Sequence, residues 1–415
     1  YLGKNERTVK RWETERGLPV HRLPGDSRSR IHAHPAELDD WLKGASAEAS
    51  EPAVAVPPAR HRPWAVGLAA AAAAGFLGAA VLGPSGLLPH TPRAPPSVAA
   101  QRLYMEGTEA WTQRTPASLN DALTRFSAAI QRDPQYAEAW AGEAKTYLLL
   151  REYTAMPESE AYGLAESAAR RALALDDDLA EAHGALGFVA ANWLWSPPLA
   201  EREYRRAVAL DPANPTLHHW FATFLLDRAR CREALAEMDR ALALSPGSST
   251  IRADRALILE YLGQSGAATG ELKRLEVAEP DFRSPHEYLS RIYFQTGPNQ
   301  AFFEESERAA RLAGDQARLA VIEAGRRAFA TGGRRAALVA MRDVQVRQMQ
   351  YGYGSAFGVA RIDAMLGDDG EACRYLRISR RRHEPPFLTA LASPEFVRLR
   401  AGPGACDAIA AMPSG

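Results

Sequence analysis

A fixed period of 34 residues runs through the middle of the chain. Pro212, Pro246 and Pro280 end the segments ALDP, ALSP and VAEP, and Gly314 ends RLAG one period later. The differences 246−212, 280−246 and 314−280 are each 34. A period of this length is typical of stacked helical hairpins, in which each hairpin buries its apolar face on its neighbours. This spacing therefore predicts an all-α solenoid and constrains the fold more than any other feature.

Three positions ahead of each closing residue carry a small, a large and a small side chain. Twelve, eight and five residues before the closing proline stand Ala122, Phe126 and Ala129; Ala200, Tyr204 and Ala207; and Ala234, Met238 and Ala241. Small residues let two helices approach closely, and the large residue fills the space between them. The pattern is also present upstream, where longer intervals indicate insertions near 153–160 and 193–198.

With this period and these residue types, the region from about 100 to 380 resembles tetratricopeptide-repeat (TPR) proteins. The resemblance implies a TPR superhelix (α-solenoid) over residues 98–380, with 381–415 as a C-terminal cap and tail. It also implies a concave groove, lined by the first helix of each hairpin, that binds a protein or peptide partner. The register places these residues in the groove: Thr216, His219, Thr223, Leu226, Asp227, Ser284, Glu287, Arg291 and Phe294. The basic and Asn residues of the carboxylate clamp of chaperone-binding TPRs are absent from these positions, which argues against a C-terminal peptide ligand of that type.

Residues 1–44 differ from the repeat region. Asn5 is a candidate helix N-cap before a short helix that ends near Gly17, and RSRIHAH has the alternation of a short β-ribbon. Pro35 then begins a further helix. This order resembles the winged helix-turn-helix of excisionase and MerR-type DNA-binding domains.

The resemblance implies DNA contacts for seven polar or basic residues of this head. Asn5, Arg7, Thr8, Lys10 and Arg11 would face the major groove, and Arg28 and Arg30 would reach the backbone or the minor groove. Residues 1–34 carry eight Lys and Arg against four Asp and Glu, a surplus of 8−4 = 4 that favours phosphate contacts. The alternative is a solvated charged helix in a module that does not bind DNA.

An apolar stretch at 64–83 lies between Pro-rich linkers at 45–63 and 84–97. Twenty helical residues span about 30 Å, so the stretch predicts a transmembrane helix, and a mobile Ala-rich linker is the alternative. Arg60 and Arg62 precede it, whereas the next cation is Arg93. This bias predicts a single-pass protein of the inner (cytoplasmic) membrane with its N-terminus in the cytoplasm and the TPR domain outside it.

The remaining composition excludes several classes of chemistry. Lys plus Arg and Asp plus Glu number 50 each, so no net charge directs the whole chain to nucleic acid or membrane. The cysteines Cys231, Cys373 and Cys406 are far apart, and we interpret them as small buried residues outside any disulfide framework. The adjacent His218 and His219 point about 100° apart on a helix and cannot chelate one metal. With no catalytic motif, we expect no enzymatic activity, no metal and no cofactor.

Head, apolar stretch and repeats together resemble bacterial membrane-tethered one-component transcription regulators. The resemblance implies DNA binding by the head, and a protein or peptide partner for the repeats. Two alternatives remain: a TPR scaffold whose head contacts another protein without binding DNA, and a regulator without a membrane span.

Overall fold

The computed structural model describes residues 21–22, 31–32, 95–154, 156–295, 297–400 and 405–410. The chain forms two compact units, Tyr1–Pro89 and His90–Gly415. In the first unit, β1 (His21–Arg22) pairs with β2 (Ile31–His32) in antiparallel register. The seven predicted DNA-binding residues, the linker at 45–63 and most of the linker at 84–97 lie outside the described residues.

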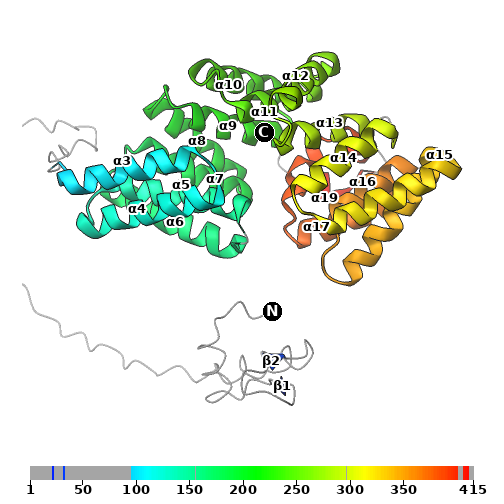
Figure 1. Ribbon diagram of the computed structural model, residues 1–415, viewed down its shortest axis with the longest axis horizontal. Helices are drawn as coiled ribbons and strands as arrows, with labels where there is room; N and C mark the ends of the chain where they lie inside the picture. Colours follow the sequence, from blue (N-terminus) through cyan, green and yellow to red (C-terminus); the bar gives the residue numbers. More distant parts are fainter. Residues whose placement is uncertain are drawn as a thin grey trace, which may run out of the picture. The chain divides into compact units, whose positions relative to one another are not determined.

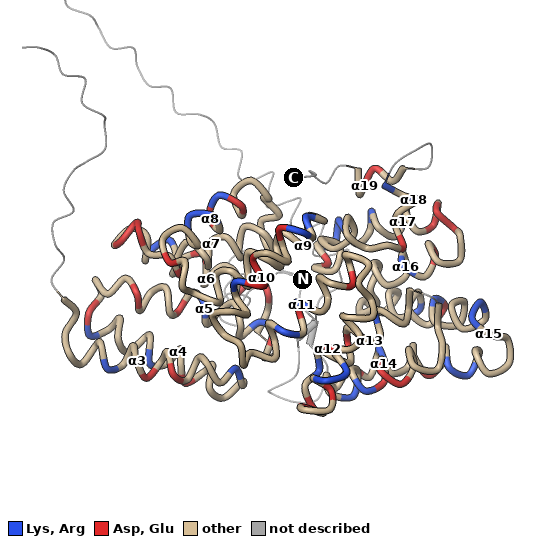
Figure 2. Tube along the Cα trace, turned by 90° about the horizontal axis from the view of Figure 1, so that it is seen from above, with Lys and Arg blue, Asp and Glu red and all other residues tan. Residues whose placement is uncertain are grey.

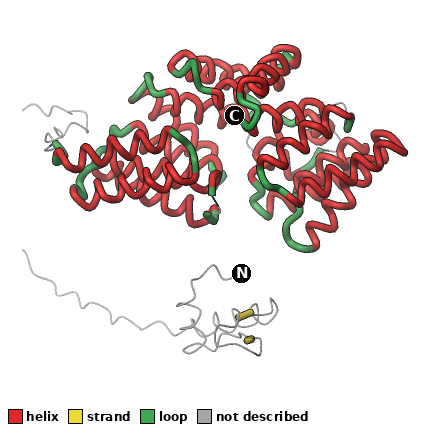
Figure 3. The backbone as a smooth tube through the Cα atoms, viewed as in Figure 1, coloured by secondary structure: helices red, strands yellow, loops and turns green. Residues whose placement is uncertain are grey.

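The second unit is a row of helical hairpins (Figure 1). Seven helix pairs are α3 (Val98–Thr112) with α4 (Pro116–Arg132), α5 (Ala137–Tyr153) with α6 (Glu158–Leu175), α7 (Ala180–Asn192) with α8 (Pro197–Leu210), α9 (Pro215–Asp227) with α10 (Cys231–Leu244), α11 (Ser249–Tyr261) with α12 (Ser265–Ala278), α13 (Arg283–Gln295) with α14 (Gln300–Leu312), and α16 (Ala356–Leu366) with α17 (Asp369–Arg381). Figure 3 shows that this unit is almost entirely helix and connecting loop in the described residues. The prediction of an all-α TPR solenoid is confirmed.

The segment α15 (Gln316–Gln350) is an eighth hairpin. At Gly333 the backbone has φ 69° and ψ −160°, so two helices meet there with a sharp turn between them. A glycine suits this position because L side chains rarely adopt positive φ. The two halves pack closely, since a Cβ on Gly325 would lie 2.5 Å from the side chain of Met341.

The small–large–small pattern sets the distance between paired helices. Ala122, Phe126 and Ala129 are fully buried. Ala234, Met238 and Ala241, which occupy the corresponding positions of a later hairpin, are fully buried as well. Alanines at the crossing let the backbones approach, which makes the interior dense without large side chains. The residue types that repeat in the sequence are therefore those that the hairpin interfaces require.

In some hairpins, a histidine near the start of the first helix contacts a glutamate of the second helix and a backbone carbonyl at the end of the preceding repeat. Nδ1 of His218 lies 2.6 Å from a carboxylate oxygen of Glu237 on α10, and its Nε2 lies 3.0 Å from the carbonyl oxygen of Pro212. His286, two periods later, repeats both contacts with Glu305 and Pro280. Buried histidines with both ring nitrogens satisfied are structural, and each joins a repeat boundary to a second helix.

The chain after α17 folds into short elements that cap the last hairpin. They are η1 (Pro385–Leu391), η2 (Pro394–Phe396), α18 (Val397–Arg400) and α19 (Asp407–Ala410). Phe387, Phe396 and Leu399 are buried in one cluster with the side chains of α16 and α17. The apolar end of the solenoid is thereby removed from water.

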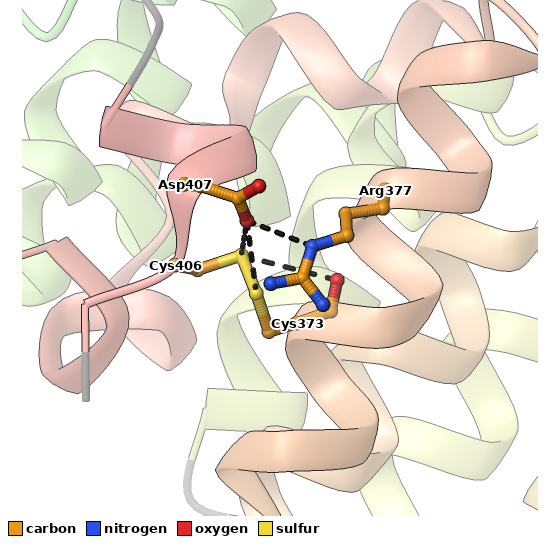
Figure 4. The surroundings of a disulfide bond; sticks show 4 residues. All are labelled: Cys373, Arg377, Cys406 and Asp407. Atoms are coloured by element: carbon orange, nitrogen blue, oxygen red, sulfur yellow. Dashed lines mark hydrogen bonds and ion pairs between the residues drawn. A yellow bond between two sulfur atoms is a disulfide. The ribbon is translucent and has the colours of Figure 1, made fainter.

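A disulfide between Cys373 and Cys406 fixes this cap to α17 (Figure 4). The interpretation of these cysteines as unpaired was wrong, because residues 33 apart in sequence meet only when the cap folds back on α17. In Figure 4, Asp407 points toward Arg377, whose Nε donates a hydrogen bond of 2.8 Å to the carboxylate.

The predicted membrane localisation is contradicted. In the described ranges, every helix is too short or too polar to cross a bilayer. Residues 64–83, on which the prediction rested, lie outside the described residues. Lys and Arg and Asp and Glu are both present along the repeats, and α15 carries seven Arg against one Glu and one Asp (Figure 2).

Candidate functional site

Two cavities lie along the first helices of the later hairpins. The small cavity, of about 170 Å³, is lined by α9, α11, α13 and η1. The large cavity, of about 430 Å³, is lined by α13, α14, α15, α16 and Pro386. We call the surface of α9, α11, α13 and α16 that lines these cavities the groove. The groove exists because α9 contacts α11, and α11 contacts α13, so that successive first helices present one continuous face.

Six of the nine predicted groove residues line the cavities. Thr223, Leu226 and Asp227 line the small cavity. Glu287 and Phe294 line the large cavity, and Arg291 lines both. The structure thus brings together residues from two hairpins that are not neighbours in sequence.

The other three predicted residues lie outside both cavities. Thr216 and Ser284 are half-buried residues of the first turns of α9 and α13. His219 is buried, and its Nε2 lies 2.6 Å from the carboxylate of Asp254 on α11. That carboxylate also accepts a hydrogen bond of 2.5 Å from the hydroxyl of Tyr288 on α13. The trio joins three first helices, and its polar atoms are engaged within the protein.

Asp227 and Arg291 are charged groups without an ionic partner in the small cavity. Among the described residues, no group forms a hydrogen bond or ion pair with the carboxylate of Asp227. Burial raises the pKa of Asp227 to about 7, against the opposing effects of Arg291 and Arg228. The guanidinium of Arg291 donates one hydrogen bond, 3.2 Å long, to Thr389 and lies over the ring of Tyr261. Such unpaired, partly desolvated charges in a cavity are typical of binding sites.

The large cavity combines an apolar wall with a polar rim. Phe294 and Met341 contribute to the wall, and the hydroxyl of Ser306 is buried there without a partner among the described residues. On the rim, Glu287 accepts a hydrogen bond of 2.6 Å from Arg318. Burial alone would raise the pKa of Glu287, but Arg318 holds it below its usual value. A volume of this size accommodates a few side chains of a peptide or one small molecule.

Comparisons with known proteins bear on the fold. No family model matches the chain. The type IV pilus assembly protein PilF of Pseudomonas aeruginosa is 33% identical over 94 residues, which are 23% of this chain and 35% of PilF, so the chain matches about a third of that relative. The solved structure of a human IFIT1 dimer with m7Gppp-AAAA has a TM-score of 0.50 at 14% identity, covering 69% of this chain and 72% of that one. YrrB, a TPR protein with an unusual peptide-binding site, has a TM-score of 0.30 at 20% identity, covering 45% of this chain and 90% of YrrB.

The period of 34 residues and the hairpins that it generates decide the class. The described repeats have the TPR fold.

Two groups of ligand-type side chains in the described residues are close enough to surround a metal ion. In the first, Cys373 and Cys406 are bonded to each other and are not available as thiolates. In the second, Glu276 and Glu305 lie beside His286, but Nζ of Lys273 is 2.8 Å and 2.6 Å from the two carboxylates. The lysine already supplies the positive charge that a metal would bring.

The contribution of α11 to the groove was not predicted from the sequence. Adding one period of 34 to Thr223 and Asp227 gives Leu257 and Tyr261, and both line the small cavity. Another period from Leu257 gives Arg291. The signal was therefore present in the sequence. The contribution of Thr389 had no such signal, because it lies beyond the repeats.

Proposed function

We propose that this TPR protein is an interaction scaffold whose groove binds a protein or peptide partner. The observation that carries the proposal is the carboxylate of Asp227, which has no hydrogen-bond or ion-pair partner among the described residues and lies in the small cavity with Arg291. A peptide can satisfy this carboxylate with its own polar groups while its apolar side chains enter the large cavity. This proposal requires no catalytic step.

The experiment compares partner capture by two variants of the full chain. Arg291→Gln removes the cation that both cavities share. Arg327→Gln is the matched control, because Arg327 is exposed, pairs with Glu323 one turn away on α15 and lines neither cavity. Proteins captured from the source cells by immobilised wild type are quantified by mass spectrometry. We expect a specific subset to be lost with Arg291→Gln and retained with Arg327→Gln. Equal capture by both variants would refute binding through the groove.

DNA binding by residues 1–44 is a second candidate function. The specific observation that favours it is the antiparallel pairing of β1 with β2, since Ile31 and His32 belong to the segment expected to form a basic ribbon. Arg11 and the neighbouring basic residues would then contact a DNA groove.

The test is a salt titration of DNA binding by the full chain. We expect Arg11→Ala to reduce discrimination between preferred and random DNA, at a cost of about 1–3 kcal/mol on the preferred site. Arg28→Ala should instead weaken binding to all sequences and lower the salt dependence by about one phosphate contact. If the wild type does not bind DNA at about 50 mM salt, the head functions in protein contacts alone.

A further inference from the structure

The groove of this protein is partly covered by its own C-terminal segment. We call residues 385–396, which comprise η1 and η2, the strap. The element η1 contacts α9, Thr389 accepts a hydrogen bond from Arg291 of α13, and Pro386 lines the large cavity. The strap therefore occupies part of the surface that a partner would have to contact.

An aromatic ring anchors the first half of the strap. Phe387 is buried and stacks on the indole of Trp195, with ring centroids 5.6 Å apart and planes inclined by 8°. Trp195 comes from the connection between α7 and α8, and its ring also lies 4.4 Å from that of His383. Both Trp195 and His383 have positive φ, 48° and 52°. Side chains of this size rarely adopt such a backbone conformation, and contacts with the strap help to offset its cost.

A carboxylate anchors the second half of the strap. The side chain of Glu395 is 5% exposed and accepts hydrogen bonds from the guanidinium of Arg361 on α16, with Nε at 2.7 Å. Arg361 also stacks on Phe294, whose ring centroid is 4.9 Å from its Cζ. Two residues that line the large cavity thus hold the acidic end of the strap.

The strap does not fill the groove. Cavities of about 170 and 430 Å³ remain beside it, the small one lined in part by Thr389 and the large one by Pro386. Between Phe387 and Glu395, the hydrogen bond that joins the strap to the groove is the one that Arg291 donates to Thr389, 3.2 Å long. Phe387, Ala390, Ser393 and Phe396 of the strap are buried, so a competing segment must replace these side chains as well as bind the carboxylate of Asp227 and fill the cavities.

The disulfide restricts that displacement. Cys373 lies before the strap and Cys406 after it, so the bond closes a loop that contains the whole strap. Closing a loop limits how far its residues can move and raises the effective concentration of the strap at the groove. Reduction leaves the strap attached at one end only.

We propose that the strap is a resident ligand of the groove, and that the partner is a peptide segment of the same chemistry which competes with it. That chemistry is an aromatic ring next to prolines and a carboxylate eight residues later, since 395−387 = 8. The inference rests on the proposed function and specifies its ligand class. Exchange between strap and partner regulates access to the groove.

The experiment measures binding of a fluorescent synthetic peptide with the sequence of residues 384–397 to the full-length protein, by fluorescence anisotropy. Glu395→Gln in the protein loosens the strap and leaves every groove residue in place. Asp369→Asn is the control, because it breaks an exposed ion pair with Arg398 just outside the strap. We expect the peptide to bind Glu395→Gln about tenfold or more tighter than the wild type or Asp369→Asn. A peptide with Ala at the position of Phe387 should bind none of them.

Two further measurements keep the test decisive if Glu395→Gln lowers the helical content. Thr389→Val removes the hydroxyl that accepts from Arg291 and donates to the carbonyl of Pro386, and it should also tighten peptide binding. Reduction of the disulfide in the wild type should do the same. Equal peptide affinity for oxidised and reduced wild type and for Thr389→Val would overturn the strap proposal. The scaffold proposal would survive that result as long as Arg291→Gln still abolishes partner capture and Arg327→Gln does not.

Discussion

Gly142 provides a quantitative test of how closely neighbouring hairpins pack. The fully buried ring of Phe126 on α4 lies against this glycine of α5. A Cβ at Gly142 would lie 2.6, 2.7 and 2.9 Å from three atoms of the ring. The ring has little space to retreat, because Gly107 of α3 also lies against it, and a Cβ there would be 2.9 Å from the ring. Gly142→Ala therefore forces the three helices apart.

The expected effect is the difference between two opposing contributions. Alanine in a helix interior is favoured over glycine by about 0.8–1.0 kcal/mol. Overpacking of a well-packed core costs about 1–3 kcal/mol. Gly142→Ala should therefore destabilise the protein by about 1 kcal/mol. Gly163→Ala, in the interior of α6, should stabilise it by up to about 1 kcal/mol, since no atom lies within 4 Å of the new Cβ.

Thermal unfolding of both variants, followed by circular dichroism, separates these contributions. A difference of about 2 kcal/mol corresponds to about 4–8 °C in melting temperature for chains of 150–250 residues, and to somewhat less for a longer chain. We expect Gly142→Ala to melt below the wild type and Gly163→Ala at or above it. If Gly142→Ala melts as high as Gly163→Ala, the ring of Phe126 has room to move and the argument for close hairpin packing fails.

Three further predictions concern the interior and the groove. Ala241→Leu should overpack the crossing of α9 and α10 and cost about 1–3 kcal/mol, and an unchanged melting temperature would contradict the assigned register. Because the pKa of Asp227 is raised to about 7, its unfolded form loses a proton at lower pH than its folded form, and stability falls as pH rises toward 7. Asp227→Asn should therefore melt higher than the wild type at pH 8, and the difference should shrink toward pH 4. The hydrogen bond with Glu237 raises the pKa of His218, so its charged form stabilises the fold below pH 6.5 and this contribution is lost as pH rises through the folded pKa. His218→Asn should thus cost more stability at pH 5.5 than at pH 8.5 in denaturant titrations.

The position of groove residues within the first helices could be predicted in part. Applying the period to Thr223, Asp227 and Arg291 identifies positions that face one cavity, because corresponding residues of stacked hairpins share a face. Thr216 and Ser284 were placed in the groove by the same register, yet they lie in first turns that both cavities leave out. Sequence spacing gives the face of a helix, whereas the extent of a cavity along that face depends on which other segments close it.

The sequence by itself determined the hairpins, because each repeat contacts mainly its neighbours and the residues of every interface recur at 34-residue intervals. Small residues at Ala234 and Ala241, around a large one at Met238, specify that interface locally. Only the tertiary structure decided that the strap covers the groove. The contact between Arg291 and Thr389 joins residues 98 apart, and it depends on the rotation between successive hairpins, which accumulates over several repeats. A periodic sequence pattern does not reveal this accumulated rotation. The disulfide of Cys373 with Cys406 likewise forms only because the chain after α17 folds back on that helix.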